Sequence, residues 1–291
     1  MLRKNLIMHN TYKNTNFIGF ESNYEDSTVV MFGAPFDGTT SFRPGTRFAP
    51  SIIRSESFGI ETYSPYLDLD VEDFSISDIG DVDLPFGNTQ KALNELFLTT
   101  EKIINDNKKP FMIGGEHLVS LPVIESLANK YKNLHIIHFD AHTDLRNEYL
   151  GESLSHATVI RRAHDILGDN RVFQFGIRSG TREEFIWSNS HTYMNKFDLN
   201  TLDEICESLK DSPVYLTIDL DVLDPSVFSG TGTPEPGGIT MKELLNSLNY
   251  LKNLNLVGAD IVELSPHYDN SGTSTAVACK MVREIGLLLA K

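Results

Sequence analysis

The segment LHIIHFDAHTD, residues 134–144, carries the pattern that decides the fold. A short apolar run of β-branched and aromatic residues is followed directly by acidic and imidazole side chains. Such a run is typical of a strand buried on both faces, and the polar residues mark its end. Similar runs recur along the chain: TVVMFGAP from Thr28, PFMIGG from Pro110, RVFQFGI from Arg171, PVYLTIDLD from Pro213 and LNLVGADIVEL from Leu254. We therefore predict six buried strands.

Segments with helical periodicity separate or follow these runs. They are residues 118–131, 156–167, 202–210, 240–251 and 275–291. Apolar strands that alternate with helices indicate a parallel sheet covered on both faces. The predicted fold class is α/β, with three α/β/α layers around a central, mostly parallel sheet. The sequence contains no internal repeat or flexible linker, so residues 1–291 are predicted to form a single catalytic domain.

Composition and charge narrow the class of protein. The chain has 291 residues, of which 40% are hydrophobic and 22% charged, as in an ordinary globular protein. Its formal net charge of -15 disfavours nucleic acid and anionic membranes as partners and weakly favours a cationic substrate. No apolar run approaches the ~18 residues of a membrane helix, and the N-terminal residues lack the apolar core of a signal peptide. We predict a cytoplasmic protein.

Two short segments place acidic and imidazole residues at spacings of two. In HFDAHTD these are Asp140, His142 and Asp144, and in TIDLDVLDP they are Asp219 and Asp221. In an extended backbone, residues two apart project to the same side, so each set can converge. Convergent carboxylates repel one another, and a bound cation or a retained proton is the usual relief. One such motif alone is equally compatible with a hydrogen-bonded loop, but together they indicate a metal centre.

A third segment adds an imidazole, because His117 follows the predicted strand at FMIGG. The carboxyl ends of parallel strands are the usual ligand site of an open sheet. The predicted metal ligands are His117, Asp140, His142, Asp144, Asp219 and Asp221. Four ionised carboxylates balance two divalent cations. The predominance of oxygen donors and the absence of a CxxC pair favour Mn²⁺, with Zn²⁺, Co²⁺ and Ni²⁺ as alternatives.

The remaining histidines and cysteines carry less information. We expect His135 and His138, which lie within a predicted strand, to be packing residues or to contact metal ligands from outside. No role is predicted for His9, His164 and His191. The two cysteines, Cys206 and Cys279, are expected to be buried and reduced.

Four sequence motifs resemble those of the ureohydrolase family, which includes arginases and agmatinases. They are GGEH (114–117), FDAHTD (139–144), SHAT (155–158) and LTIDLDVLDPS with GTGTPEPGG (216–238). The agmatinase branch is the nearer one. The resemblance covers most of the chain, and it implies an arginase-like fold and a homo-oligomer, often a trimer or hexamer.

The resemblance also implies roles for individual residues. The six predicted ligands match the family's two-manganese site, in which Asp140 and Asp219 would bridge the ions. His156 matches the catalytic histidine, and Glu263 matches the carboxylate that binds the guanidinium group. Three residues depart from the family pattern, which puts the local loop shape in doubt but not the ligands. They are Ala49 and Ala157, where many relatives have glycine, and Glu116, where arginases have aspartate.

The expected chemistry is hydrolysis of a guanidino compound. A guanidinium ion stays protonated at neutral pH, so a stronger nucleophile than water is needed, and we expect a metal-bridging hydroxide oriented by Asp144. Glu263 would orient the substrate through a bidentate pair. His156, with an ordinary imidazole pKa of ~6.5, would carry a proton to the leaving amine.

The substrate is predicted from the loop LRNEYLGESLS, residues 145–155. It lacks the Asn/Ser/Thr-rich pattern expected of arginine-specific relatives and favours agmatine, which would give putrescine and urea. Guanidinobutyrate, guanidinopropionate, guanidine and arginine are alternatives. We expect Arg146, Asn147 and Tyr149 to be solvated loop residues rather than pocket residues. A one-zinc deacetylase and a catalytically silent metal-binding protein are the competing classes.

Overall fold

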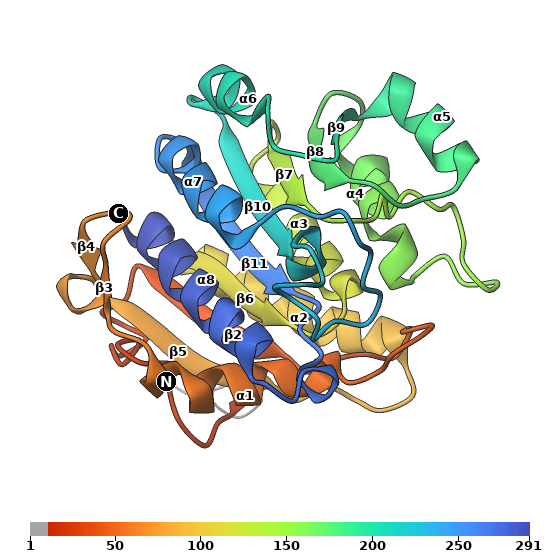
Figure 1. The fold of residues 1–291 in the computed structure, drawn as a ribbon. Helices are drawn as coiled ribbons and strands as arrows, with labels where there is room; N and C mark the ends of the chain where they lie inside the picture. The colour runs from red at the N-terminus through yellow and green to blue at the C-terminus, as the bar shows by residue number, and fades with distance from the viewer. Residues whose placement is uncertain (1–10) are drawn as a thin grey trace.

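The computed structural model describes residues 11–291, and one nine-stranded sheet runs through them (Figure 1). Its spatial order is β1-β5-β2-β6-β11-β10-β7-β8-β9. Neighbouring strands are parallel except for β1, which pairs antiparallel with β5. The strands are β1 (Thr11–Tyr12), β2 (Val29–Ala34), β5 (Ile76–Val82), β6 (Lys109–Gly114), β7 (His135–Phe139), β8 (Val172–Ile177), β9 (Tyr193–Lys196), β10 (Pro213–Asp219) and β11 (Asn255–Val262). A separate two-stranded ribbon consists of β3 (Tyr63–Ser64) and β4 (Leu69–Asp70).

Helices cover both faces of the large sheet (Figure 1). One layer contains α1 (Ala49–Glu56), α6 (Leu202–Leu209), α7 (Met241–Leu251) and α8 (Thr273–Ala290). The other contains α2 (Thr89–Asn105), α3 (Ser120–Lys130) and α4 (Val159–Leu167), and α5 (Arg182–His191) packs beside β9 at the sheet edge. Each layer buries its own apolar cluster against the sheet. The predicted three-layer α/β/α architecture is confirmed.

All six predicted strands are present, as β2, β6, β7, β8, β10 and β11. Each is buried along most of its length, because helices pack on both faces of the sheet. The five predicted helices are present as well, with ends that differ by a few residues. The remaining elements were not predicted from the sequence: β1, β3, β4, β5, β9, α1, α2 and α5.

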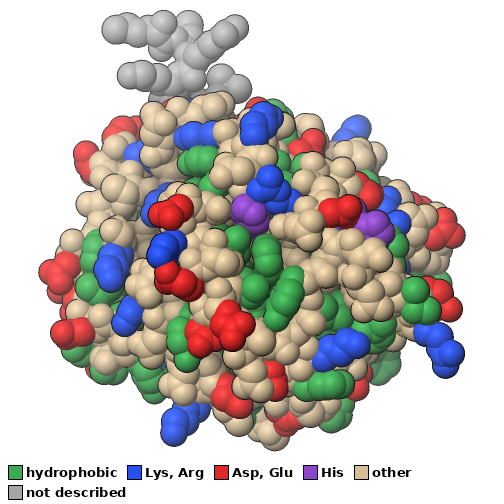
Figure 2. All heavy atoms as spheres, turned by 90° about the horizontal axis from the view of Figure 1, so that it is seen from above, with side chains coloured by type: hydrophobic (Ala, Val, Ile, Leu, Met, Phe, Trp, Pro, Cys, Tyr) green, Lys and Arg blue, Asp and Glu red, His purple; other side chains and the backbone are tan. Residues whose placement is uncertain are grey.

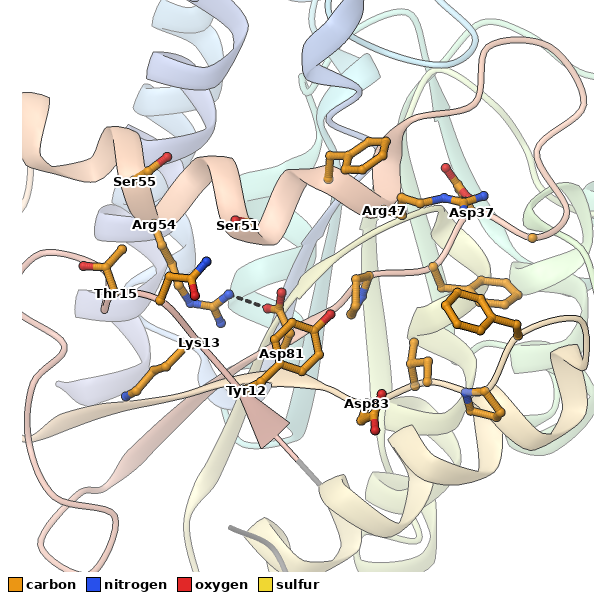
Figure 3. Close-up of a pocket in the computed structure, with 18 of the residues that line it drawn as sticks. Tyr12, Lys13, Thr15, Asp37, Arg47, Ser51, Arg54, Ser55, Asp81 and Asp83 are labelled. Atoms are coloured by element: carbon orange, nitrogen blue, oxygen red, sulfur yellow. Dashed lines mark hydrogen bonds and ion pairs between the residues drawn. The ribbon is translucent and has the colours of Figure 1, made fainter. Parts of the chain in front are cut away.

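Strand β5 was missed because charged residues interrupt its apolar pattern. Asp78 and Asp81 are both buried, and Arg54 from α1 forms an ion pair with each of them. The Arg54 guanidinium donates to both oxygens of Asp78, at 2.8 and 3.0 Å, and also to Asp81. Figure 3 shows the Arg54–Asp81 ion pair among the residues that line a pocket. The volume of this pocket is about 420 Å³. A buried ion pair across two distant segments leaves no trace in local hydrophobic periodicity.

The surface carries charges of both signs, and the two cysteines are buried and free, as expected. Acidic and basic side chains are interspersed across the face seen in Figure 2. Cys206 and Cys279 are both free and buried. Across residues 11–291, no helix combines the length and apolarity that crossing a bilayer requires. His9, for which the sequence predicted no role, lies outside the described residues.

Candidate metal centre and active site

Four neighbouring strands of the sheet end at one site. In spatial order they are β6, β11, β10 and β7. His117 begins the short 3-10 helix η4 (His117–Val119) after β6, and Glu263 directly follows β11. Asp219 ends β10, and Asp140 directly follows β7. Parallel strands deliver their carboxyl ends to the same edge, which explains why residues far apart in sequence meet here.

The local geometry differs from the extended backbone that sequence analysis expected. Asp140 to Asp144 form a loop beyond β7, and Asp144 has a left-handed φ of 51°. Asp221 lies in the 3-10 helix η6 (Leu220–Val222). Asp140 Oδ1 accepts from the His142 backbone N–H, and Asp219 Oδ1 accepts from the Asp221 N–H at 2.8 Å. These tight turns, not a strand face, bring the side chains together.

Three carboxylates converge on one nitrogen of His117. Its Nδ1 lies 3.1 Å from Asp140 Oδ2, 3.2 Å from Asp144 Oδ2 and 3.5 Å from Asp219 Oδ2. The His117 side chain is 1% exposed, so bulk water cannot separate these groups. One nitrogen surrounded by three oxygens is the donor set that a cation with mixed oxygen and nitrogen ligands requires.

A hydrogen-bond chain behind His117 fixes which nitrogen faces the carboxylates. Thr217 Oγ1 donates to Asp260 Oδ1 at 2.6 Å and lies 3.0 Å from His117 Nε2. Because the Thr217 proton is directed to Asp260, its oxygen accepts from His117 Nε2–H. Nδ1 is then the nitrogen that can bind a cation once it releases the proton that the surrounding carboxylates favour, as is usual for metal-binding histidines. Thr217 and Asp260 were not predicted, because nothing in their local sequence links them to His117.

A second cluster forms around His142. Its Nδ1 lies 3.0 Å from Asp221 Oδ2 and 3.4 Å from Asp140 Oδ1. Asp140 therefore faces His117 with one oxygen and His142 with the other. Asp221 Oδ2 is buried and accepts no hydrogen bond in the described part of the chain, despite this short contact. A buried carboxylate oxygen aimed at an imidazole without a hydrogen bond fits two ligands of one ion.

The pKa shifts of the clustered carboxylates also favour a bound cation. Burial and repulsion from Asp221 and Asp140 raise the pKa of Asp219 well above its usual range. Burial and the Asp140 charge raise the pKa of Asp144 to about 7. Within residues 11–291, no lysine or arginine forms an ion pair with Asp140, Asp144, Asp219 or Asp221. The ion-pair partners of these carboxylates in this part of the chain are imidazoles, and the carboxylates raise the pKa of His117 and His142 well above the ordinary value although burial opposes the charge.

His138 contacts a predicted ligand from behind, as expected. Its Nε2 lies 2.8 Å from Asp140 Oδ2, and the Gln174 side-chain amide nitrogen lies 3.2 Å from its Nδ1. All three side chains are fully buried. This arrangement holds the Asp140 carboxylate in a fixed orientation toward His117.

Glu263 approaches the cluster from β11. Its Oε1 accepts from the His117 backbone N–H at 2.7 Å, and its own N–H donates to the Gly115 carbonyl at 2.9 Å. Its φ of 69° is left-handed and turns the side chain toward the cavity. Burial and the nearby Glu116 charge raise the pKa of Glu263 well above its ordinary value. A cationic ligand would stabilise the negative charge of Glu263.

His156 lies across the cavity, at the start of the 3-10 helix η5 (His156–Thr158) before α4. Its Nε2 is 3.4 Å from Ser41 Oγ, and its backbone N–H donates to Thr39 Oγ1 at 3.1 Å. Burial and the charge of His142 lower the pKa of His156 to about 4. The expectation of an ordinary pKa is therefore wrong, and the imidazole is neutral near pH 7.

The loop after β2 completes this side of the site. Glu116 accepts from the Thr39 backbone N–H at 2.9 Å and from the hydroxyls of Thr39 and Thr40. Gly115 permits the close approach, because a Cβ there would lie 1.9 Å from the Phe36 carbonyl oxygen. Glu116 thus positions Thr39, which in turn holds His156. This role of Glu116 was not predicted from the sequence, in which the residue is only a departure from the family pattern.

The residues enclose a cavity of about 220 Å³. His117, Asp144, His156, Asp219 and Glu263 line it, and so do Arg146 and Tyr149. The expectation that Arg146 and Tyr149 are solvated loop residues is therefore wrong. The Arg146 guanidinium carbon lies 4.7 Å from the Tyr149 ring centroid, which positions both at the rim. Asn147 accepts from Arg162 instead and does not line the cavity.

Known proteins are similar to this chain in sequence and in fold. Residues 27–287 match the model of the arginase family. The chain belongs to the arginase family. It is 50% identical to the agmatinase of Bacillus anthracis over 279 residues, which cover 94% of this chain and 96% of the relative. It is 33% identical to the guanidinobutyrase of Pseudomonas aeruginosa over 275 residues, which cover 88% of this chain and 85% of that relative.

Solved structures agree with this assignment. The crystal structure of agmatine ureohydrolase of Thermoplasma volcanium matches with a TM-score of 0.85 and 31% identity, over 96% of this chain and 94% of that one. The predicted resemblance to ureohydrolases is confirmed. In this arginase-family enzyme, three of the quoted motifs span the carboxyl ends of β6, β7 and β10, where the two clusters lie.

Proposed function

We propose that this chain hydrolyses agmatine to putrescine and urea, with two Mn²⁺ ions bound per chain. The observation that carries the proposal is the convergence of three buried carboxylates on His117 Nδ1, with no lysine or arginine paired to them within residues 11–291. The similarity to an agmatinase at 50% identity supports the substrate. The lower identity to a guanidinobutyrase, 33%, makes guanidinobutyrate the second candidate.

Two groups of side chains would hold the ions. The group around His117 contains Asp144, the group around His142 contains Asp221, and Asp140 and Asp219 would bridge them. The contacts of both Asp140 oxygens support its bridging role. When bound, a pair of divalent cations supplies Lewis acidity, which makes water a competent nucleophile near neutral pH. Oxygen-rich ligands favour Mn²⁺ over a structural zinc.

Glu263 would bind the substrate guanidinium. A planar guanidinium matches a carboxylate in a bidentate pair, and this pair fixes the orientation of the carbon that is attacked. One oxygen of Glu263 already accepts from the His117 N–H, which holds the carboxylate rigidly in the cavity. Asp144 lines the same cavity and would orient the attacking water.

His156 would move a proton to the departing amine. Since its pKa of about 4 keeps the imidazole neutral near pH 7, it would relay a proton rather than store one. Ser41 Oγ at 3.4 Å from Nε2 offers a partner for that relay at the cavity wall. Arg146 and Tyr149 at the rim would restrict which chain can follow the guanidinium group.

A comparative urea-release assay tests the proposal. Agmatine, arginine, guanidinobutyrate, guanidinopropionate and guanidine should be assayed side by side with Mn²⁺, Zn²⁺, Co²⁺ or Ni²⁺ added to metal-free protein. We expect the highest kcat/KM with agmatine and Mn²⁺, and two ions per chain by elemental analysis. One ion per chain would favour the deacetylase class. Absence of urea with every substrate would favour a silent metal-binding protein.

Two further predictions concern the context of the enzyme. Free, buried Cys206 and Cys279 suit a reducing compartment, which supports a cytoplasmic location. The trimer or hexamer implied by the family stays a prediction, and size-exclusion chromatography with light scattering tests it.

A further inference from the structure

A second group of metal-binding side chains lies outside the catalytic cavity. It consists of His164 near the end of α4, Asp169 in the following turn and His191 at the end of α5, whose ligand atoms lie close together. Helices α4 and α5 lie on the β9 side of the sheet (Figure 1). His164 Nε2 lies 2.8 Å and His191 Nδ1 lies 2.7 Å from the same oxygen, Asp169 Oδ1. Three separate segments thus direct two imidazoles and one carboxylate to one point.

The geometry is close to that of a bound ion. On a tetrahedral ion with bonds of about 2.0–2.1 Å, donor atoms stand about 3.3 Å apart, so Asp169 would have to withdraw by roughly 0.5 Å. Its side chain is 54% exposed in a turn, and such a shift is easily accommodated. Hydrogen bonds from His191 and His164 hold the pKa of Asp169 below its ordinary value, so the carboxylate is ionised and ready to bind.

The imidazole rings are held in place by Trp187. It stacks on His191 with ring centroids 4.2 Å apart and an interplanar angle of 19°. It meets His164 edge to face at 4.7 Å. The Arg161 guanidinium carbon lies 4.0 Å from the Trp187 ring centroid and covers it. Rings fixed in advance by packing lose little entropy when they bind an ion.

We propose that His164, Asp169 and His191 form a separate site for a divalent transition-metal ion that prefers imidazole, such as Cu²⁺, Ni²⁺ or Zn²⁺. Two imidazoles and one carboxylate suit these ions better than Mn²⁺, which stands lowest in the usual affinity order. Water would complete the coordination on the exposed side of Asp169.

A bound ion would join the ends of two helices that frame the catalytic cavity. Helix α4 begins just after His156, and Glu184 in the first turn of α5 accepts from the Thr143 hydroxyl and the Leu145 N–H. The ion would therefore stabilise the packing of α4 and α5, and with it the loop beyond β7 that Glu184 contacts. Ions that bind only the folded state raise the unfolding temperature as their concentration rises.

Trp187 is the chain's single tryptophan and offers a local probe. The experiment titrates Cu²⁺ into Mn²⁺-loaded protein, above the ordinary imidazole pKa of about 6.5, and follows Trp187 fluorescence. We expect saturable quenching at one Cu²⁺ per chain, with Zn²⁺ competing for the same site.

Two variants and one control decide the outcome. Asp169→Ala and His191→Gln should each raise the Cu²⁺ concentration at the quenching midpoint by at least about tenfold. Loss of a residue that only supports a metal ligand already lowers metal affinity about tenfold, and these residues would be ligands themselves. His135→Gln removes an imidazole of β7 that contacts Arg171, outside both clusters, and should keep the original midpoint. Equal midpoints in the original chain and both variants, or no quenching in the original chain, would overturn the proposal. Circular dichroism checks that each variant is folded.

Discussion

Two buried clusters of carboxylates in this enzyme are balanced in different ways. In the first, Asp78 and Asp81 on β5 are paired with Arg54, which is 2% exposed and reaches both of them. In the second, the ion-pair partners of Asp140 and Asp219 among residues 11–291 are all imidazoles. The chain supplies a permanent cation for the structural cluster. It leaves the other cluster incomplete, and that difference marks it as a site for bound cations.

The difference lies in cost as well as in charge. A buried carboxylate without a partner is expensive, and removing one member of a buried pair typically costs about 3–5 kcal/mol. The Arg54 cluster avoids this cost in the folded chain alone. The cluster at the ends of β6, β10 and β7 avoids it only when ions or protons are bound. Five predictions follow the comparison from the largest effect to the smallest.

The largest effect is expected at Asp140. Asp140→Ala removes the carboxylate that faces both His117 and His142, so we expect loss of bound Mn²⁺ and a fall in kcat/KM of more than about 10⁴-fold, since the metals supply most of the rate enhancement. Metal content and urea release measure both. A variant that keeps two ions and substantial activity would contradict the assignment of Asp140 as a bridge.

The second effect concerns the balanced cluster. Arg54→Met leaves Asp78 and Asp81 buried without a cation and should lower the free energy of unfolding by about 3–5 kcal/mol. Denaturant unfolding measures this change, which should be equal with and without Mn²⁺. The kcat per folded molecule should stay unchanged. A stability loss that depends on Mn²⁺ would show that the two clusters are not independent.

The third effect is a pH dependence at His156. Its pKa is about 4 in the folded chain against an ordinary value of about 6.5, so the unfolded chain binds more protons between these values. The free energy of unfolding therefore decreases as the pH falls from 6.5 toward 4. The part of this decrease that is due to His156 is at most about 3 kcal/mol, and above pH 6.5 His156 causes no loss.

His156→Ala should remove this part of the pH dependence. The measurement compares unfolding of metal-free protein at pH 7 and pH 5, since metal release then plays no part. We expect a smaller difference between the two pH values in His156→Ala than in the original chain. Equal differences would mean that His156 titrates normally.

The fourth effect separates substrate binding from metal binding. Glu263→Gln keeps an oxygen that can accept from the His117 N–H but removes the charge that would pair with a guanidinium. We expect kcat/KM for agmatine to fall by roughly 10- to 100-fold, the equivalent of one charge-assisted hydrogen bond, with two Mn²⁺ retained. Loss of metal in this variant would instead make Glu263 part of the metal centre.

The fifth effect is the smallest, and its sign is the informative part. Asp219→Asn removes a carboxylate whose pKa is raised by burial and by Asp221 and Asp140, so metal-free protein should become slightly more stable near neutral pH. Asp78→Asn weakens a balanced pair and should destabilise metal-free protein. Thermal unfolding of both variants after chelation tests this contrast. Destabilisation by Asp219→Asn would remove the distinction between the clusters.

The sequence predicted the central strands well because each is apolar along its length. β7 and β10 are covered by helices on both faces, so burial alone determines their composition. β5 was missed because Asp78 and Asp81 are acceptable only when Arg54 is packed against them. Helix α5 was missed because its apolar side packs mainly at the sheet edge, and its periodicity is weak.

The candidate ligands were predicted from residue type and spacing, but for a partly wrong geometric reason. An extended strand was expected to align Asp140 and Asp144, whereas a loop with a left-handed Asp144 places them. Glu116 and Thr39 escaped notice because their contact joins the loop after β2 to the end of β6. The low pKa of His156 likewise arises from burial and from His142, which is distant along the backbone.

The sequence by itself determined the alternation of strands and helices, the family and the set of groups that can bind cations, because these depend on residue type and short-range spacing. The tertiary structure decided which carboxylates receive an internal cation and which remain unbalanced. It also decided which histidine stays neutral and that two further imidazoles meet Asp169. Burial and electrostatic interaction depend on distance in space, and only the folded chain sets that distance.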